Sequence, residues 1–169
     1  MSGPVLRAVE EADLPALLEL NNAAAPAVNV IDADELAQLV GWSAVALTVD
    51  DGAPAALMLA LPPGLDYPSE NYRFFTERAT AADTDFLYVD RIVVAPQLRS
   101  TGIGRRLYDA VIAAAAEQDR DEVLCEVNVA PPNPGSMRFH LGLGFAEVGQ
   151  QRTKGGAVEV AMLARDVAP

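Results

Sequence analysis

The segment over 86–129 constrains the fold of this chain more than any other part of the sequence. It begins with FLYVDRIVV, a nearly continuous run of β-forming residues over 86–94. Apolar residues then recur with helical spacing over 102–118, and a second β-forming run follows over 121–129. A strand, a glycine-containing turn, a helix and a strand in this order indicate a βαβ unit.

Other elements are expected on both sides of this unit. Asp51-Gly52 lies between two apolar runs, a pattern typical of a β-hairpin. Acidic residues precede two leucine-containing runs near the N-terminus, which indicates the starts of two short helices. The further elements expected are a strand over 5–9, hairpin strands over 44–49 and 55–61, a helix over 133–143, and strands over 145–149 and 158–163.

No regular element is expected over 62–85, because prolines and a glycine interrupt its first part. A loop of this length in a compact domain indicates either a functional lid or an element that the pattern missed. Its aromatic residues either anchor a surface loop on the core or close over a substrate; they are Tyr67, Tyr72, Phe74 and Phe75.

The composition fits one domain over 1–169 with a substantial core, since 51% of the 169 residues are hydrophobic. The 24 acidic and 12 basic residues give a net charge of −12, which disfavours nucleic acids and anionic membranes as partners. Neither a signal peptide nor a membrane-spanning segment is visible, so a cytoplasmic protein is expected. The sequence leaves open whether the protein is a monomer or a homodimer.

Cysteine and metal chemistry are not expected. Cys125 is the single cysteine, so the chain cannot form an intrachain disulfide or a cysteine-based zinc site. We interpret it as a core thiol. No set of His, Asp and Glu residues has the spacing of metal ligands, and no metal is predicted.

The turn between the strand and the helix of the βαβ unit carries the clearest functional signal. It reads Arg99-Ser100-Thr101-Gly102-Ile103-Gly104 and is followed by Arg105 and Arg106. A helix N-terminus presents unpaired backbone N–H groups, and glycines let a pyrophosphate approach them. The arginines add positive charge, so the turn predicts an anionic ligand; a tight structural turn is the alternative. The glycine spacing matches neither the Rossmann nor the Walker motif.

Further motifs flank this turn. Val94-Ala95-Pro96 precedes it, and Asn133-x-x-Ser136-x-x-Phe139-His140 and then Gly144-Phe145 follow it. With them, most of the chain resembles the GNAT superfamily of N-acetyltransferases, and an uncharacterised bacterial subgroup in particular. The resemblance implies an α/β (α+β) fold, in which about four helices flank a mixed, mostly antiparallel sheet of six to seven strands. The fourth and fifth strands would splay apart.

The resemblance also implies how acetyl-CoA would bind. The slot between the splayed strands would take the pantetheine arm, lined by backbone groups of Ile92, Val93 and Val94. The amides of the turn over 99–104, beside Arg105, would hold the pyrophosphate of coenzyme A. Asn133 would contact the cofactor from the other side; its alternative role is to cap the helix that it precedes.

The resemblance assigns a general acid and a general base. Seven residues after the asparagine, much of the superfamily has a tyrosine that protonates the CoA thiolate, whereas this chain has His140. An imidazole can supply that proton near neutral pH, although a lone histidine on a helix is also compatible with a structural role. Ribosomal-protein N-acetyltransferases of the superfamily carry a Glu-Val pair on strand five with the glutamate as base, and Glu126-Val127 matches that pair. Here the pair lies seven residues before Asn133 instead of five.

Two neighbouring residues are reserve candidates. Alternation along the strands places Tyr88 and Asp90 on one face of the strand over 86–94, and Glu126 on one face of the next strand. Asp90 is therefore a second candidate for the base, and Tyr88 for the acid. Ordinary ion pairing or solvation is the alternative for both carboxylates.

Two functions agree with these residues. The first is acetyl transfer from acetyl-CoA to a primary amine of a small molecule or amino acid, with a peptide N-terminus as the second acceptor class. The aromatic residues over 62–85, with Asn21, Asn22 and Asn29, would line a small acceptor pocket. The other function is a non-catalytic acyl-CoA-binding or sensing domain, which needs the turn over 99–104 but neither acid nor base.

Overall fold

The computed structural model describes residues 2–168, which form two compact units. The first unit contains the chain up to Pro62 and the segment Val89–Val111, and the second contains Pro63–Tyr88 and the chain from Ile112 onward. Strand β4 and helix α4 each run from one unit into the other. That the whole chain acts as one domain stays a prediction.

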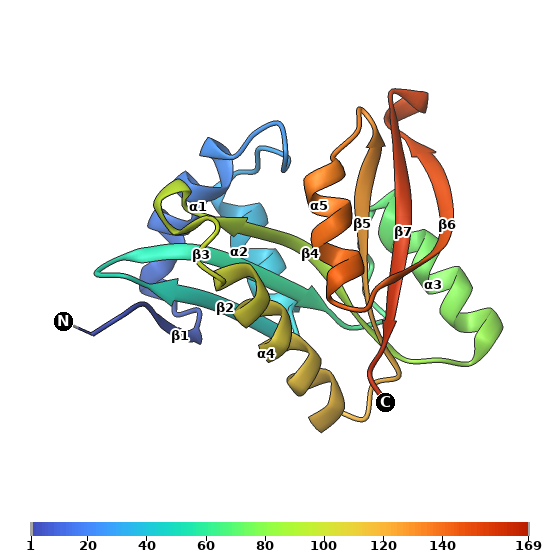
Figure 1. The fold of residues 1–169 in the computed structure, drawn as a ribbon, viewed down its shortest axis with the longest axis horizontal. Helices are drawn as coiled ribbons and strands as arrows, with labels where there is room; N and C mark the ends of the chain where they lie inside the picture. The colour runs from blue at the N-terminus through green and yellow to red at the C-terminus, as the bar shows by residue number, and fades with distance from the viewer. Residues whose placement is uncertain (1, 169) are drawn as a thin grey trace. The chain divides into compact units, whose positions relative to one another are not determined.

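The fold class expected from the sequence is confirmed (Figure 1). The sheet has the strand order β1-β2-β3-β4-β5-β7-β6, in which β4 and β5 are parallel and the pairs β1–β2, β2–β3, β5–β7 and β6–β7 are antiparallel. The strands are β1 (Val5–Ala8), β2 (Val45–Asp50), β3 (Pro54–Leu61), β4 (Phe86–Val94), β5 (Glu122–Ala130), β6 (Ala146–Thr153) and β7 (Val158–Asp166). The helices are α1 (Leu14–Ala23), α2 (Ala33–Trp42), α3 (Glu70–Ala82), α4 (Ile103–Glu117) and α5 (Pro134–Gly142).

In the first unit, α1 and α2 contact each other and both contact β3. Leu17 of α1, Leu36 of α2 and Leu57 of β3 are fully buried. The predicted hairpin turn between β2 and β3 is confirmed, and Gly52 has the positive φ of 90° that suits glycine. Helix α2 begins with a reciprocal capping box between Asp32 and Glu35.

In the second unit, three residue pairs join β4 to β5, from Phe86 with Glu122 to Tyr88 with Leu124. The last strand, β7, lies between β5 and β6 and pairs with both (Figure 1). The order of these last strands did not follow from the sequence pattern. That β4 and β5 splay beyond their paired residues stays a prediction.

Helix α3 corrects the prediction of a loop over 62–85. Residues Glu70–Ala82 form a helix that begins at Ser69, whose hydroxyl accepts a hydrogen bond from the Tyr72 amide at 3.2 Å. Tyr72, Phe75 and Ala79 are buried on one face of it. These three residues are spaced as on one face of a helix. However, the face has few apolar residues, two of them aromatic, and the helix follows a proline-rich stretch. The segment therefore gave a weak helical pattern, and of the two interpretations of 62–85 the structure shows the missed element.

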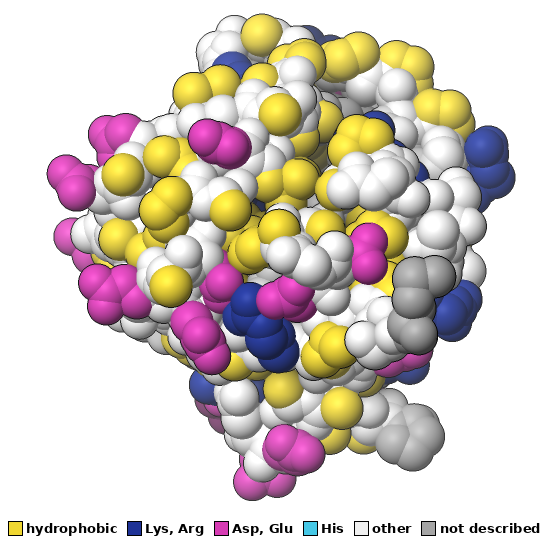
Figure 2. Space-filling view, turned by 90° about the vertical axis from the view of Figure 1, so that its left-hand side faces the viewer, with side chains coloured by type: hydrophobic (Ala, Val, Ile, Leu, Met, Phe, Trp, Pro, Cys, Tyr) yellow, Lys and Arg dark blue, Asp and Glu magenta, His cyan; other side chains and the backbone are white. Residues whose placement is uncertain are grey.

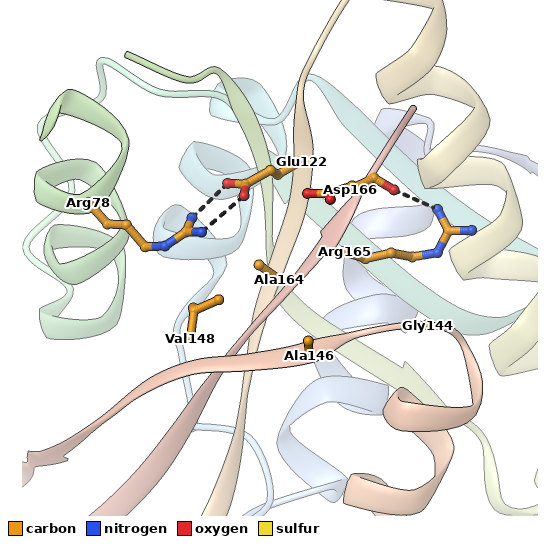
Figure 3. A pocket seen from close by; sticks show the side chains of 8 residues that line it. All are labelled: Arg78, Glu122, Gly144, Ala146, Val148, Ala164, Arg165 and Asp166. Carbon is orange, nitrogen blue, oxygen red and sulfur yellow. Dashed lines mark hydrogen bonds and ion pairs between the residues drawn. The ribbon is translucent and has the colours of Figure 1, made fainter. Parts of the chain in front are cut away.

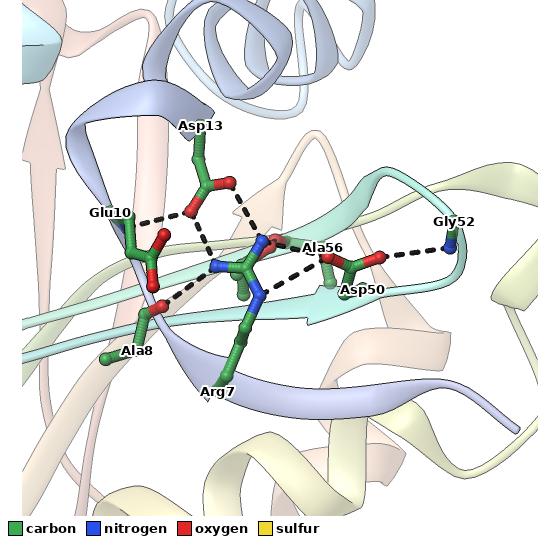
Figure 4. A network of polar contacts seen from close by, with 8 residues as sticks. Arg7, Ala8, Glu10, Asp13, Asp50, Gly52 and Ala56 are labelled. Atoms are coloured by element: carbon green, nitrogen blue, oxygen red, sulfur yellow. Dashed lines mark hydrogen bonds and ion pairs between the residues drawn. The ribbon is translucent and has the colours of Figure 1, made fainter. Parts of the chain in front are cut away.

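A compact ion-pair cluster joins β1 to the start of α1 and to β2 (Figure 4). The Arg7 guanidinium donates to both carboxylate oxygens of Asp13, at 2.7 and 2.9 Å, and to Asp50 at 2.9 Å. Asp13 also accepts from the Glu10 amide at 2.8 Å. These bonds, above all those from Arg7, lower the pKa of Asp13 to about 2.

The cluster predicts a loss of stability in acid. The pKa of Asp13 is lower in the folded protein than in the unfolded chain, so its contribution is complete above about pH 4 and is lost as pH falls toward 2. Asp13→Asn should lower the free energy of unfolding at pH 7 by on the order of 2 kcal/mol and should flatten its decline below pH 4. Urea denaturation at several pH values measures this, with the exposed Asp51→Asn as control. Equal acid sensitivity of wild type and Asp13→Asn would contradict the assignment.

Candidate active site

The predicted phosphate turn precedes α4 in the first unit. Helix α4 begins at Ile103, so Gly104 is its second residue. In the turn, Ser100 and Gly102 have positive φ values of 61° and 86°. A Cβ built on Gly102 would meet no atom within 4 Å, so the backbone there is open to a ligand.

Side chains around the turn are exposed or support it. The Thr101 hydroxyl donates to the Leu98 carbonyl, and Arg99 Nε donates to the Val94 carbonyl at 3.2 Å. Arg99 and Arg105 lie at the surface. An open backbone at the start of a 15-residue helix, with arginines beside it, fits the diphosphate of acetyl-CoA.

The other residues predicted to contact the cofactor lie in separate elements. Ile92, Val93 and Val94 form the end of β4 in the first unit. Asn133 is exposed at the start of α5 in the second unit, where its side-chain oxygen accepts a hydrogen bond from the Ser136 amide at 3.2 Å. The capping role considered for Asn133 is therefore confirmed, and a contact with the cofactor stays a prediction.

The second unit brings together the predicted base and one predicted acid. Tyr88 Oη donates a hydrogen bond to Glu126 Oε1 at 2.9 Å. The parallel register explains this contact, because Tyr88 is paired with Leu124 and Glu126 lies on the same face two residues further along. The Tyr88 ring is buried against Tyr72 and Phe75, with centroids at 5.9 and 5.6 Å. Tight packing fixes the phenol that contacts the Glu126 carboxylate.

Asp90, the reserve base, takes part in a buried ion pair. Arg91 Nε donates to Asp90 Oδ2 at 2.8 Å, and the two side chains are 7% and 4% exposed. No motif in the sequence singles out Arg91. The sequence did contain a signal for this ion pair, because Asp90 and Arg91 are adjacent charged residues inside a run of β-forming residues, and buried charges usually occur in pairs.

His140, the other predicted acid, is buried in α5. Its Nδ1 lies 2.7 Å from the Ser136 carbonyl, which can only accept, so Nδ1 carries a proton. The ring packs edge-to-face on Phe139 and Phe145. Burial lowers the pKa of His140, and the Ser136 carbonyl offsets part of this effect. The imidazole is therefore mainly neutral at pH 7, which disfavours it as the group that donates a proton.

A pocket of about 370 Å³ lies elsewhere in the second unit (Figure 3). Arg78 from α3 pairs with both oxygens of the buried Glu122, at 2.7 and 3.1 Å. Arg165 Nε donates to the Leu143 carbonyl. The pocket lining includes none of the predicted site residues. Among residues 2–168, no group of His, Cys, Asp and Glu side chains could hold a metal ion.

Comparisons with known proteins agree with the fold. Residues 14–145 match the Acetyltransferase (GNAT) family, while no curated protein sequence matches the chain. The fold is similar to that of the ribosomal-protein-S18-alanine N-acetyltransferase from Escherichia coli, with a TM-score of 0.73 and 18% identity over 98% of this chain and 95% of that one. It is also similar to yncA from Salmonella typhimurium with its cofactor acetyl-CoA, with a TM-score of 0.70 and 19% identity over 99% and 96%.

NAA60 from Arabidopsis thaliana, solved in complex with acetyl-CoA, is a further structural relative. Its TM-score is 0.76, at 15% identity over 96% of this chain and 99% of that one. The chain belongs to the acetyltransferase (GNAT) family, which is an acetyl-CoA-dependent class of N-acetyltransferases. The family, the fold class and the cofactor expected from the sequence are thus confirmed.

Proposed function

We propose that this protein transfers the acetyl group of acetyl-CoA to a primary amine of a small molecule or an amino acid. The observation that carries the proposal is the hydrogen bond between Tyr88 and Glu126, which places a carboxylate and a phenol side by side. Acetyl transfer to an amine needs both kinds of group, because the amine must lose a proton and the CoA sulfur must gain one.

Each part of the proposed site has one task in the acetyl transfer. Bound acetyl-CoA supplies an acetyl group activated as a thioester. The turn over 99–104 holds its diphosphate, and the backbone of 92–94 holds its arm. Glu126 takes one proton of the ammonium group and releases it to water, so that the amine nitrogen can bond to the acetyl carbon as the carbon–sulfur bond breaks. The bonded nitrogen then loses a second proton to Glu126, which leaves a neutral amide. Tyr88 Oη then gives a proton to the sulfur and can recover one from Glu126 across their hydrogen bond.

The charge of the chain supports a cationic acceptor. The net charge is −12, and Figure 2 shows acidic side chains scattered among apolar ones on the face that it displays. Such a surface attracts an ammonium group and repels anions. A peptide N-terminus is the second candidate, because the similar Escherichia coli enzyme acts on the alanine of a ribosomal protein.

An acceptor panel tests the proposed function. Release of free CoA from acetyl-CoA is measured with aliphatic amines, with free amino acids and with short peptides that have unblocked N-termini. We expect turnover with amines or amino acids and little with peptides. Turnover with peptides alone would replace the acceptor class, and no turnover with either would favour a non-catalytic acyl-CoA sensor.

The identity of the acid gives a separate prediction. Tyr88→Phe should lower kcat by ~10²- to 10³-fold, because the proton donor is lost while the ring still fills its site. His140→Asn should lower kcat by less than about tenfold, because the buried imidazole is mainly neutral at pH 7. Steady-state kinetics on folded variants measure both. The reverse order of effects would assign the acid to His140, as the resemblance implies.

A further inference from the structure

The pocket of about 370 Å³ in Figure 3 has no task in the proposed acetyl transfer, and all of its lining residues belong to the second unit. Its volume is within the range of small-molecule sites, about 300 to 1,000 Å³. Ala146 of β6 and Ala164 of β7 are direct partners in the sheet, so two methyl groups stand where larger side chains would fill the space. Together with Val148 they give the pocket an apolar wall.

Helix α3 closes the opposite side of this pocket with Arg78. Phe74, four residues earlier and therefore on the same side of the helix, lies so close to β6 that a Cβ on Gly149 would be 2.8 Å from its ring. At Arg78 the helix instead faces the two alanines and contacts the sheet through an ion pair with Glu122. The pocket is thus a hollow beneath an otherwise closely packed helix.

Two opposite charges face each other in the pocket without pairing. Arg78 donates to both oxygens of Glu122, which uses two of the five N–H donors of a guanidinium. Asp166 is the partner of Glu122 in the sheet, so its side chain is on the same face. Within residues 2–168 its carboxylate forms no hydrogen bond or ion pair. The pKa of Arg78 is raised chiefly by its hydrogen bonds with Glu122, and the charge of Asp166 adds to this effect.

The charges on the lining sum to zero. Arg78 and Arg165 balance Glu122 and Asp166. Two backbone carbonyls hold the Arg165 guanidinium, those of Leu143 at 2.8 Å and Asp166 at 3.1 Å, and among the described residues it pairs with no carboxylate. A ligand with a single charge would leave wall charges of the opposite sign unmatched. A ligand with both charges and a small apolar group matches the pocket better.

We propose that this pocket is a second small-molecule site, which binds a free α-amino acid with an apolar side chain. The carboxylate of the ligand accepts from N–H groups of Arg78 that Glu122 leaves unused, and its ammonium group donates to Asp166. Its side chain lies against Ala146, Val148 and Ala164. The site contains neither Tyr88 nor Glu126, so the inference does not rest on the proposed acetyl transfer.

Calorimetric titration of the acetyl-CoA-free protein tests the ligand chemistry. The probes are valine, isobutylamine, which lacks its carboxylate, and isovalerate, which lacks its ammonium group. Valine should bind with a Kd below about 1 mM and at least about tenfold more tightly than either of the other probes. Equal affinities of the three would overturn the assignment of a zwitterion, and no binding of valine at about 10 mM would overturn the site.

Substitutions in the lining test the location. Ala146→Leu, at an exposed position of the edge strand β6, fills the pocket, and Asp166→Asn removes the partner of the ammonium group. Each should weaken valine binding at least about tenfold. The controls are Ala8→Leu, at an exposed position of the other edge strand, β1, and the exposed Asp66→Asn. Both should bind valine like the wild type, and thermal unfolding checks each fold. Wild-type affinity in both lining variants would overturn the proposal.

Glu126→Gln distinguishes this site from that of acetyl transfer. It should bind valine like the wild type, because Glu126 is not among the lining residues. Loss of binding in Glu126→Gln, with binding retained in Ala146→Leu, would place the amino acid at the acetyl-transfer site and overturn the second site. Failure of every acceptor in the panel would contradict the proposed function alone, since valine binding is measured without turnover.

Discussion

Glu126→Gln is expected to lower kcat by ~10²- to 10⁴-fold with little change in acetyl-CoA affinity. The substitution removes the charge that accepts the proton of the amine. It keeps an oxygen in the place of Oε1, so the hydrogen bond from Tyr88 can remain. The packing around Tyr88 should therefore be preserved, and the loss should appear in the chemical step. Steady-state kinetics and calorimetric titration with CoA measure the two effects separately.

Glu122→Gln is the matched control, because Glu122 lies in the same strand and is also buried. Its carboxylate pairs with Arg78, so the substitution should lower stability and leave kcat within about threefold of wild type. A kcat of Glu126→Gln close to that of wild type would remove Glu126 from the role of base. Equal losses in both variants would show that the effect comes from the strand and not from a proton transfer.

Gly104→Val is expected to weaken acetyl-CoA binding by at least about tenfold, or about 1.4 kcal/mol. Gly104 is the second residue of α4, where a branched side chain would stand between the backbone amides and the diphosphate. The fold should persist, because valine has a higher helix propensity than the glycine that it replaces. Calorimetric titration with CoA measures the affinity, and thermal unfolding checks the fold.

Gly41→Val provides the control for this substitution. Gly41 also lies within a helix, α2, and a Cβ there would meet no atom within 4 Å. The two variants therefore share the change in helix propensity, and Gly41→Val should bind CoA like the wild type. An unchanged affinity of well-folded Gly104→Val would place the diphosphate elsewhere.

Strong local patterns were enough to predict most of the elements. Strand β4 was expected over 86–94 and has those bounds, since nearly every residue in it favours a strand. The hairpin turn at Gly52 and the start of α4 after Gly102 follow from the conformational freedom of glycine. Helix α3 was missed because its buried face carries only Tyr72, Phe75 and Ala79, so that its periodicity is short.

The residues expected to line the acceptor pocket show why side-chain roles are harder to predict. Asn21 and Asn22 bind the backbone of the connection after α1, and Tyr72 and Phe75 are buried around Tyr88. Their residue types suit both substrate binding and internal packing. Which of the two occurs depends on neighbours that are distant in the sequence, such as Arg91 for Asn21.

The sequence by itself determined the βαβ unit, the hairpin and the turn before α4, because these depend on residues close together in the chain. The fold class and the candidates for catalysis came from the resemblance of the sequence to a known family. Only the tertiary structure decided how the candidates pair. The register of β4 with β5 brings Tyr88 to Glu126, 38 residues away, whereas Asp90 contacts Arg91. Strand alternation shows which face a residue shares, but its hydrogen-bond partner depends on register and burial, and these arise only when the whole core packs.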